Sequence, residues 1–146
     1  FMIIDCMPSL GMLTINALTA ADSVLIPMEP EYYAADGLME LLKVYSANKA
    51  KFNPDLKIEG IVLTFDTPTF NNSKRNKKAV ISTYGDKIRI FKESIPRAVT
   101  IAGTASEGIS IFAYDGSGKG AQRYQKLVEG VLDHAKTKKG NTFNKL

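Results

Sequence analysis

Short apolar runs alternate along the chain with longer segments that have helical spacing. The apolar runs lie at residues 1–5 (FMIID), 23–27 (SVLIP), 58–64 (IEGIVLT) and, more weakly, 88–91 and 111–113. Continuous apolar runs that end in Asp, Pro or Thr are typical of strands buried on both faces of a parallel sheet. The pattern therefore predicts five strands.

The segments between these runs predict helices. Residues 11–21 are apolar on most sides, and residues 34–45 carry an apolar stripe with spacings of three and four residues. Residues 72–84 begin with basic positions, and residues 118–136 have a clear apolar face. Strands and helices alternate, which predicts an α/β fold with a mainly parallel sheet flanked by helices.

Length and composition fit one globular domain. The chain has 146 residues, of which 45% are hydrophobic and 23% charged, and this composition argues against disorder. No apolar run approaches the ~20 residues that a membrane-spanning helix needs. A single cysteine and a single histidine, His134, exclude an internal disulfide framework and disfavour metal sites built from those residues. We expect a cytoplasmic domain over residues 1–136 and a basic, flexible tail over 137–146.

Charge is distributed unevenly. Residues 1–70 hold 4 Lys/Arg and 9 Asp/Glu, a net charge of −5, whereas residues 71–146 hold 15 and 6, a net charge of +9. A basic half suggests a polyanionic partner, either nucleic acid or an anionic membrane surface. A solvated basic surface without a partner is the alternative. Four cations crowd the start of one predicted helix, where the helix dipole disfavours them: Lys74, Arg75, Lys77 and Lys78.

The first apolar run ends in Asp5 and is followed at once by CMPSLG. A carboxylate at the end of a parallel strand lies in the crevice where α/β proteins bind ligands. There it can support Mg²⁺, as in the Walker B strand of P-loop NTPases. Buried strands also end in an Asp that caps a helix, so the pattern alone leaves both interpretations open.

The surrounding sequence closely resembles the ParA/Soj family of DNA-partitioning ATPases. Residues 3–38 read IIDCMPSLGMLTINALTAADSVLIPMEPEYYAADGL. The family's run is similar to IIDxPPSLxxLTxNALxAADxVLIP, followed by EYxAxxGL. Shorter matches follow in order at residues 58–64, 95–97, 114–115 and 118–121, so the resemblance extends from Phe1 to about His134.

This resemblance implies a P-loop NTPase domain of the SIMIBI type. ParA-like proteins bind ATP and Mg²⁺, form homodimers around the nucleotides and then bind DNA without sequence specificity. A ParB-like partner stimulates ATP hydrolysis and releases them. The cycle positions plasmids, chromosomes or conjugative elements, and it implies a nucleoid-associated protein in the cytoplasm.

The resemblance also implies residue roles. Asp5 matches the Walker B carboxylate that supports Mg²⁺ through a water molecule. Pro8, Ser9 and Gly11 match the switch II segment that senses the γ-phosphate, so Asp5 and Pro8 are the candidate catalytic residues. The residues that match the family's adenine pocket are Thr64, Pro96 and Arg97. Those that match the run near the dimer interface are Glu31, Tyr32, Ala34 and Gly37.

Basic residues late in the domain contact DNA in this family. The candidate DNA-binding residues here are Lys74, Arg75, Lys77, Lys78, Lys87 and Lys119. Contacts of this kind bind phosphates without reading sequence and weaken with salt.

The sequence also departs from the family. No GxxxxGK[ST] loop is present, and in relatives that loop lies before the residue that matches Asp5. We therefore expect a C-terminal portion of such a domain, which by itself neither binds ATP tightly nor hydrolyses it. Met7 replaces the first proline of DxPP, residues 67–70 lose the arginine of the family's DxRT run, and residues 102–107 differ from SEAPSH near the base.

Two other interpretations stay open. The chain could be a nucleotide-independent DNA-binding or interaction module of a truncated ParA-like protein. It could also resemble MinD relatives, which anchor to membranes by a C-terminal amphipathic helix. The tail offers only Phe143 and Leu146 as large apolar groups after Ala135, too little area for stable surface binding. A partial domain exposes sheet edges and apolar surface, which predicts self-association or low stability.

Overall fold

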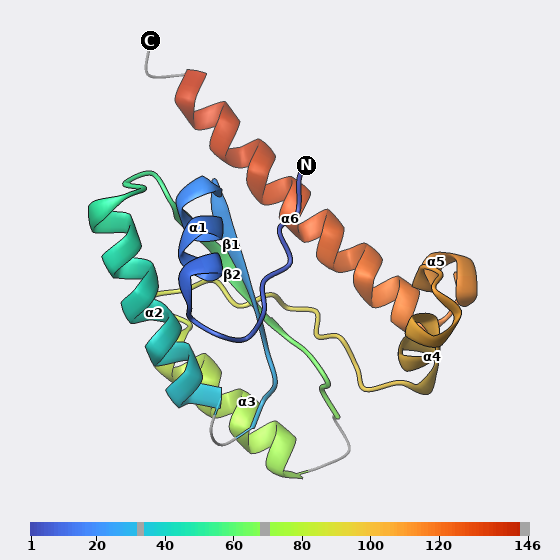
Figure 1. The fold of residues 1–146 in the computed structure, drawn as a ribbon. Helices are drawn as coiled ribbons and strands as arrows, with labels where there is room; N and C mark the ends of the chain where they lie inside the picture. The colour runs from blue at the N-terminus through green and yellow to red at the C-terminus, as the bar shows by residue number, and fades with distance from the viewer. Residues whose placement is uncertain (32–33, 68–70, 144–146) are drawn as a thin grey trace.

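The computed structural model describes residues 1–31, 34–67 and 71–143. Helices alternate with strands over the first half of the chain, and helices follow in the second half (Figure 1). The elements are α1 (Met12–Ala20), β1 (Ser23–Met28), α2 (Ala34–Lys51), β2 (Lys57–Leu63), α3 (Asn71–Tyr84), α4 (Val99–Glu107), α5 (Ile111–Tyr114) and α6 (Lys119–Phe143). The predicted α/β fold is confirmed.

The two strands pair in parallel. Ser23 is opposite Lys57 and Met28 is opposite Leu63, with one register irregularity between Val24 and Leu25. The chain after α3 then runs beside β2 and forms isolated parallel bridges, one of them between Ile90 and Ile61. β2 therefore lies between β1 and the segment 88–96.

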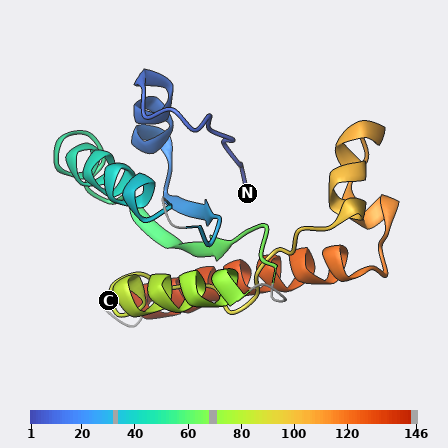
Figure 2. The ribbon, with the colours of Figure 1, turned by 90° about the horizontal axis from the view of Figure 1, so that it is seen from below.

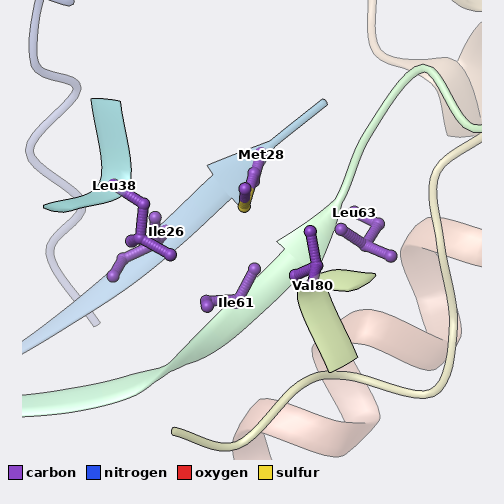
Figure 3. Packing of buried hydrophobic residues seen from close by; sticks show 6 residues of the cluster. All are labelled: Ile26, Met28, Leu38, Ile61, Leu63 and Val80. Atoms are coloured by element: carbon purple, nitrogen blue, oxygen red, sulfur yellow. The ribbon is translucent and has the colours of Figure 1, made fainter. Parts of the chain in front are cut away.

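Helices pack on both faces of this strand pair. Successive residues of a strand point to opposite faces, and β2 is buried on both, with Ile61, Val62 and Leu63 at most 3% exposed. Ile61 and Leu63 belong to a cluster that reaches α2 and α3 (Figure 3). Val62 belongs to a second cluster that includes Leu127 of α6. Figure 2 shows α2 on one side of the strands and α6 on the other.

The first cluster is the centre of the domain. Each of its members is buried, and together they come from both strands and from two helices. They are Ile26, Met28, Leu38, Ile61, Leu63 and Val80. The apolar runs of the two strands and the apolar stripe of α2 therefore meet in one cluster.

The predicted strand at residues 1–5 is wrong. These residues form no regular element and lead as an extended trace toward α1 (Figures 1 and 2). Phe1, Met2 and Ile3 are 97%, 92% and 90% exposed. A strand needs a neighbour to satisfy its backbone N–H and C=O groups. Among the residues described, no strand pairs with this segment.

Two further expectations differ from the structure. Residues 111–113 lie in the short helix α5, because the Ser110 side chain accepts a hydrogen bond from the Ala113 N–H (3.2 Å) and caps its start. Residues 88–91 make one isolated bridge in place of a regular strand. Helix α4, which the apolar pattern does not reveal, ends at Gly108 with φ 63°, a left-handed conformation typical of a helix C-terminus.

The last helix is longer than predicted. The apolar face ends near residue 136, yet α6 continues to Phe143 and includes residues 137–143 of the predicted tail. Over the part of the chain described, no helix has the length and apolar character needed to cross a membrane.

Candidate nucleotide edge and basic surface

The carboxyl ends of the strands meet at one edge of the sheet. The Thr64 N–H donates to the Met28 carbonyl (2.9 Å), which joins the ends of β2 and β1. On the other side, the Ile95 N–H donates to the Leu63 carbonyl (2.8 Å), and the Asp66 N–H donates back to the Ile95 carbonyl (3.1 Å). In α/β proteins this edge is where ligands bind. We call residues 64–66 and 94–97 the carboxyl edge.

The structure brings the predicted base-pocket residues together at this edge. Pro96 forms a parallel bridge with Asp66, two residues after Thr64. The guanidinium of Arg97 lies 5.4 Å from the centre of the Phe65 ring. Thr64, Pro96 and Arg97 are therefore neighbours although about 30 residues separate them along the chain.

Phe65 is a feature of the edge that the sequence analysis missed. Its φ is 51°, in the left-handed region that residues other than glycine rarely adopt. Phe65 is 51% exposed, and its ring lies beside the exposed Arg97. A half-exposed ring with a guanidinium beside it offers stacking surfaces for a planar group. An aromatic residue directly after a buried strand was the only signal in the sequence.

A buried carboxylate lies at the same edge. Asp66 is 6% exposed, and its Oδ2 accepts hydrogen bonds from the Lys77 ammonium (3.0 Å) and the Ser94 hydroxyl (2.6 Å). Asp66 thereby joins the end of β2 to α3 and to the segment beside Pro96. Lys77, a candidate DNA contact by sequence, is an ion-pair partner in the structure.

The candidate catalytic residues lie on the segment that precedes α1. Asp5, Pro8, Ser9 and Gly11 are all exposed. The Ser9 carbonyl accepts a hydrogen bond from the Thr14 hydroxyl (2.6 Å), and the Gly11 carbonyl accepts one from the Ile15 N–H (3.1 Å). These bonds fix the start of α1 but leave Asp5 on a segment without regular structure.

The side chains that could bind a metal ion show how far this chain could hold Mg²⁺. Within the described ranges, no group of three or more His, Cys, Asp or Glu side chains is placed to bind a metal ion. Mg²⁺ in nucleotide sites is held by one or two carboxylates together with substrate phosphates. A single carboxylate such as Asp5 fits a contact through water in such a site, whereas the phosphate-binding GxxxxGK[ST] loop is not among the 146 residues.

The basic candidates divide into paired and unpaired side chains. Five of them are exposed and, in the ranges described, form no ion pair with an acidic residue: Lys74, Arg75, Lys78, Lys87 and Lys119. Lys74 and Lys78 are four residues apart and share one side of α3. Lys119 begins α6 beside α4 and α5, away from α3 in both views (Figures 1 and 2).

A second buried carboxylate attaches α6 to the sheet. Glu59 of β2 is 7% exposed, and its Oε1 contacts the His134 Nδ1 and lies 3.5 Å from the Arg89 Nη1. Arg89 also donates to the Gly130 carbonyl (3.2 Å) and covers the Phe91 ring at 4.3 Å. The one histidine of the chain is thus partly buried between α6 and β2.

Sequence comparisons connect this architecture to known proteins. A protein-family model described as an AAA domain matches residues 1–58. The sporulation initiation inhibitor protein Soj of Bacillus subtilis is 43% identical over 131 residues, which are 90% of this chain and 51% of that protein. The chromosome partitioning protein ParA of Myxococcus xanthus is 43% identical over 132 residues, 90% of this chain and 46% of that protein. The chain spans about half the length of the curated relatives it matches.

Solved structures share the fold. Cobyrinic acid a,c-diamide synthase from Mycobacterium smegmatis superposes with a TM-score of 0.71 at 30% identity, over 90% of this chain and 46% of that chain. The same enzyme has been solved with a bound ATP analog and magnesium. Apo McdA of Cyanothece, at 20% identity and a TM-score of 0.69, covers 82% of this chain and 48% of its own and supports the fold alone. The chain belongs to the ParA/Soj-type family and carries part of a P-loop NTPase fold.

Proposed function

We propose that this chain is the C-terminal part of a ParA-like partitioning ATPase, which dimerises with ATP, binds DNA without sequence specificity and hydrolyses ATP when a ParB-like partner stimulates it. The observation that carries the proposal is the carboxyl edge, where hydrogen bonds between residues 63–66 and Ile95 bring Thr64 beside Pro96 and Arg97. Family membership supports the same assignment, since Soj and ParA are its relatives.

In the full-length protein, ATP and Mg²⁺ supply the reacting phosphates and the charge that stabilises them. Asp5 would support the Mg²⁺ ion through a water molecule, and Pro8, Ser9 and Gly11 would respond to the γ-phosphate. The carboxyl edge holds the base, with Phe65 and Arg97 offering flat surfaces. Hydrolysis is an in-line attack of water, so these residues act by positioning and by stabilising charge. Without a GxxxxGK[ST] loop, the present 146 residues neither bind ATP tightly nor hydrolyse it.

The candidate DNA contacts are the exposed cations without an acidic partner in the described ranges: Lys74, Arg75 and Lys78 on α3, Lys87 after that helix, and Lys119 at the start of α6, away from α3. Lys77 is held by Asp66 in an ion pair and would contact DNA only when that pair is broken. Each phosphate contact releases counterions, so binding weakens with salt and does not depend on sequence. Such a surface suits a nucleoid-associated protein in the cytoplasm.

The decisive test is the native reading frame upstream of Phe1, followed by a binding assay on the protein it encodes. We expect a Gly-rich loop with its lysine and an Asp-bearing switch before Phe1, and DNA binding that requires ATP. A start codon directly before Phe1, with no such loop, would overturn the ATPase assignment.

The second candidate is a DNA-binding or interaction module that needs no nucleotide. It is favoured by one observation: Lys74, Arg75 and Lys78 are exposed on a helix that lies wholly within this chain. Fluorescence anisotropy with a labelled duplex, with and without ATP, separates the two. Equal affinity of the longer protein in both conditions supports the module.

A further inference from the structure

Asp66 is the most constrained polar side chain at the carboxyl edge. It is 6% exposed, and one of its oxygens, Oδ2, accepts from both Lys77 (3.0 Å) and Ser94 (2.6 Å). Its backbone N–H donates a hydrogen bond to the Ile95 carbonyl. Three segments that are distant along the chain therefore depend on the position of this carboxylate.

Lys77 differs from its basic neighbours on α3. Lys74, Arg75 and Lys78 are exposed, whereas the Lys77 side chain is 32% exposed and its ammonium is on Asp66. A buried carboxylate requires a cation or hydrogen-bond donors nearby, because an unpaired buried charge is costly. Lys77 meets that requirement, and as a consequence its charge is withdrawn from the surface that the other three cations share.

We propose that the ion pair with Asp66 keeps the Lys77 ammonium from contacting DNA, so that α3 offers one phosphate contact fewer while the pair is intact. We call this the reserve model. The inference rests on the proposed DNA binding. Because the Lys77 side chain is one-third exposed, its ammonium reaches solvent once Asp66 no longer holds it. Asp66 is then a positioning residue: its state at the base-binding edge sets the number of cations that α3 presents to DNA. Thermodynamic linkage makes this effect reciprocal, because a DNA phosphate that binds Lys77 removes the cation from Asp66.

A purely structural ion pair makes the opposite prediction. If Lys77 only fastens α3 to the sheet, then Asp66→Asn loosens α3 and leaves DNA affinity unchanged or weaker. In the reserve model, Asp66→Asn strengthens DNA binding and makes its salt dependence steeper. The salt slope separates the two, because loss of stability does not add a phosphate contact.

The experiment uses the longer protein that contains this chain, with ATP and Mg²⁺ present, and measures its affinity for a labelled DNA duplex between 50 and 200 mM KCl, roughly the range over which phosphate contacts change affinity most. For Asp66→Asn we expect binding about five- to tenfold tighter at 100 mM salt and a log–log slope steeper by about 0.9, the value for one added contact. Lys77→Met is expected to bind like the wild type, and the double variant like Lys77→Met.

Glu40→Gln is the matched control. It makes the same change in net charge, but Glu40 is exposed on α2, where its ion pair is with Lys43 of the same helix (3.9 Å). We expect an unchanged slope and a shift below about twofold, because distant exposed charges are screened. The proposal is overturned if Asp66→Asn behaves like Glu40→Gln, or if Lys77→Met weakens binding as much as Lys74→Met.

A second measurement keeps the proposal testable if Asp66→Asn does not fold or if the longer protein with ATP does not bind DNA. Brief acetylation of the folded wild type, read by mass spectrometry, reports the reactivity of each lysine. We expect Lys77 to be modified several-fold more slowly than Lys74 and Lys78. Equal rates overturn the reserve model. Slow modification, together with no DNA binding by the longer protein in the presence of ATP, leaves Asp66 as the partner that holds Lys77 and refutes the proposed function.

Discussion

Residues 1–5 and β2 are similar in sequence and opposite in environment. FMIID and KIEGIVL are both apolar runs, yet Ile61 and Leu63 are 0% and 1% exposed while Phe1 and Ile3 are 97% and 90% exposed. β2 pairs with β1 on one side and contacts Ile90 on the other. Residues 1–5 have no paired neighbour in the ranges described. Apolar sequence favours burial, but backbone pairing decides whether a strand forms.

The two parts of the candidate site also differ in how well they are held by the rest of the structure. The strongest family motif, around Asp5 and Pro8, lies on the segment with the least structure. The weaker matches at Thr64, Pro96 and Arg97 lie on an edge held by backbone hydrogen bonds. Similarity of sequence is therefore a poor guide to which half of the site is preformed in this chain.

The largest expected effect is a direct test of the contrast. Ile61→Ala removes a fully buried side chain from the first cluster, and we expect a loss of about 2–5 kcal/mol in the free energy of unfolding. Ile3→Ala removes an exposed side chain and should cost less than about 0.5 kcal/mol. Urea denaturation followed by circular dichroism measures both. Equal losses would mean that residues 1–5 pack on the domain in solution.

The next largest loss in the free energy of unfolding is expected from a substitution at a glycine of β2. Gly60 has φ +152°, and a Cβ there would lie 2.8 Å from the Arg89 carbonyl oxygen and 2.8 Å from the Phe91 ring. We expect Gly60→Ala to cost about 2–3 kcal/mol through strain and overpacking. Gly37→Ala on α2 is the control, because nothing lies within 4 Å of its added Cβ. It should be neutral or stabilising by up to about 1 kcal/mol, and a comparable loss in both variants would contradict the packing argument.

The attachment of α6 to β2 gives a smaller effect. Glu59→Gln removes the charge that faces Arg89 and His134, and we expect a loss of about 1–3 kcal/mol from the unpaired donors left behind. The Lys43–Glu40 pair is exposed, so Glu40→Gln should cost about 0.5 kcal/mol or less. Thermal unfolding of both variants checks this. A Glu59→Gln domain as stable as Glu40→Gln would show that the buried contact does not hold α6.

We expect the smallest effect on unfolding from substitutions in the exposed apolar segment at residues 1–5. These substitutions should instead change how the protein associates in solution. Phe1, Met2, Ile3, Met7 and Met12 are each more than 60% exposed. Apolar patches of this kind promote association. Replacing Phe1 and Ile3 together by Ser should reduce the apparent mass in light scattering behind size exclusion while leaving the melting temperature within about 1–2 °C, because exposed substitutions change stability little. An association that persists unchanged would place the contact elsewhere, for example on the edge of β1 opposite β2, which pairs with no strand of the described residues.

The sequence by itself determined the local elements and the family. Continuous apolar runs specified β1 and β2, and helical spacing specified α2, α3 and most of α6. Matches spread along the chain identified the ParA/Soj-type family, and they also named Thr64, Pro96 and Arg97 before the structure placed these residues together. Each strand, helix or motif is a property of a short segment, and so it can be recognised from neighbouring residues alone.

Only the tertiary structure decided which segments found partners. Residues 1–5 have the composition of a strand but no neighbour to bond in the described ranges, and Ser110 turns an apolar run into the start of α5. Lys77 and Ser94 meet Asp66 from 11 and 28 residues away, and His134 meets Glu59 from 75 residues away. Hydrogen bonds and ion pairs are short-ranged, so their partners are set by how distant segments pack and not by the order of residues along the chain.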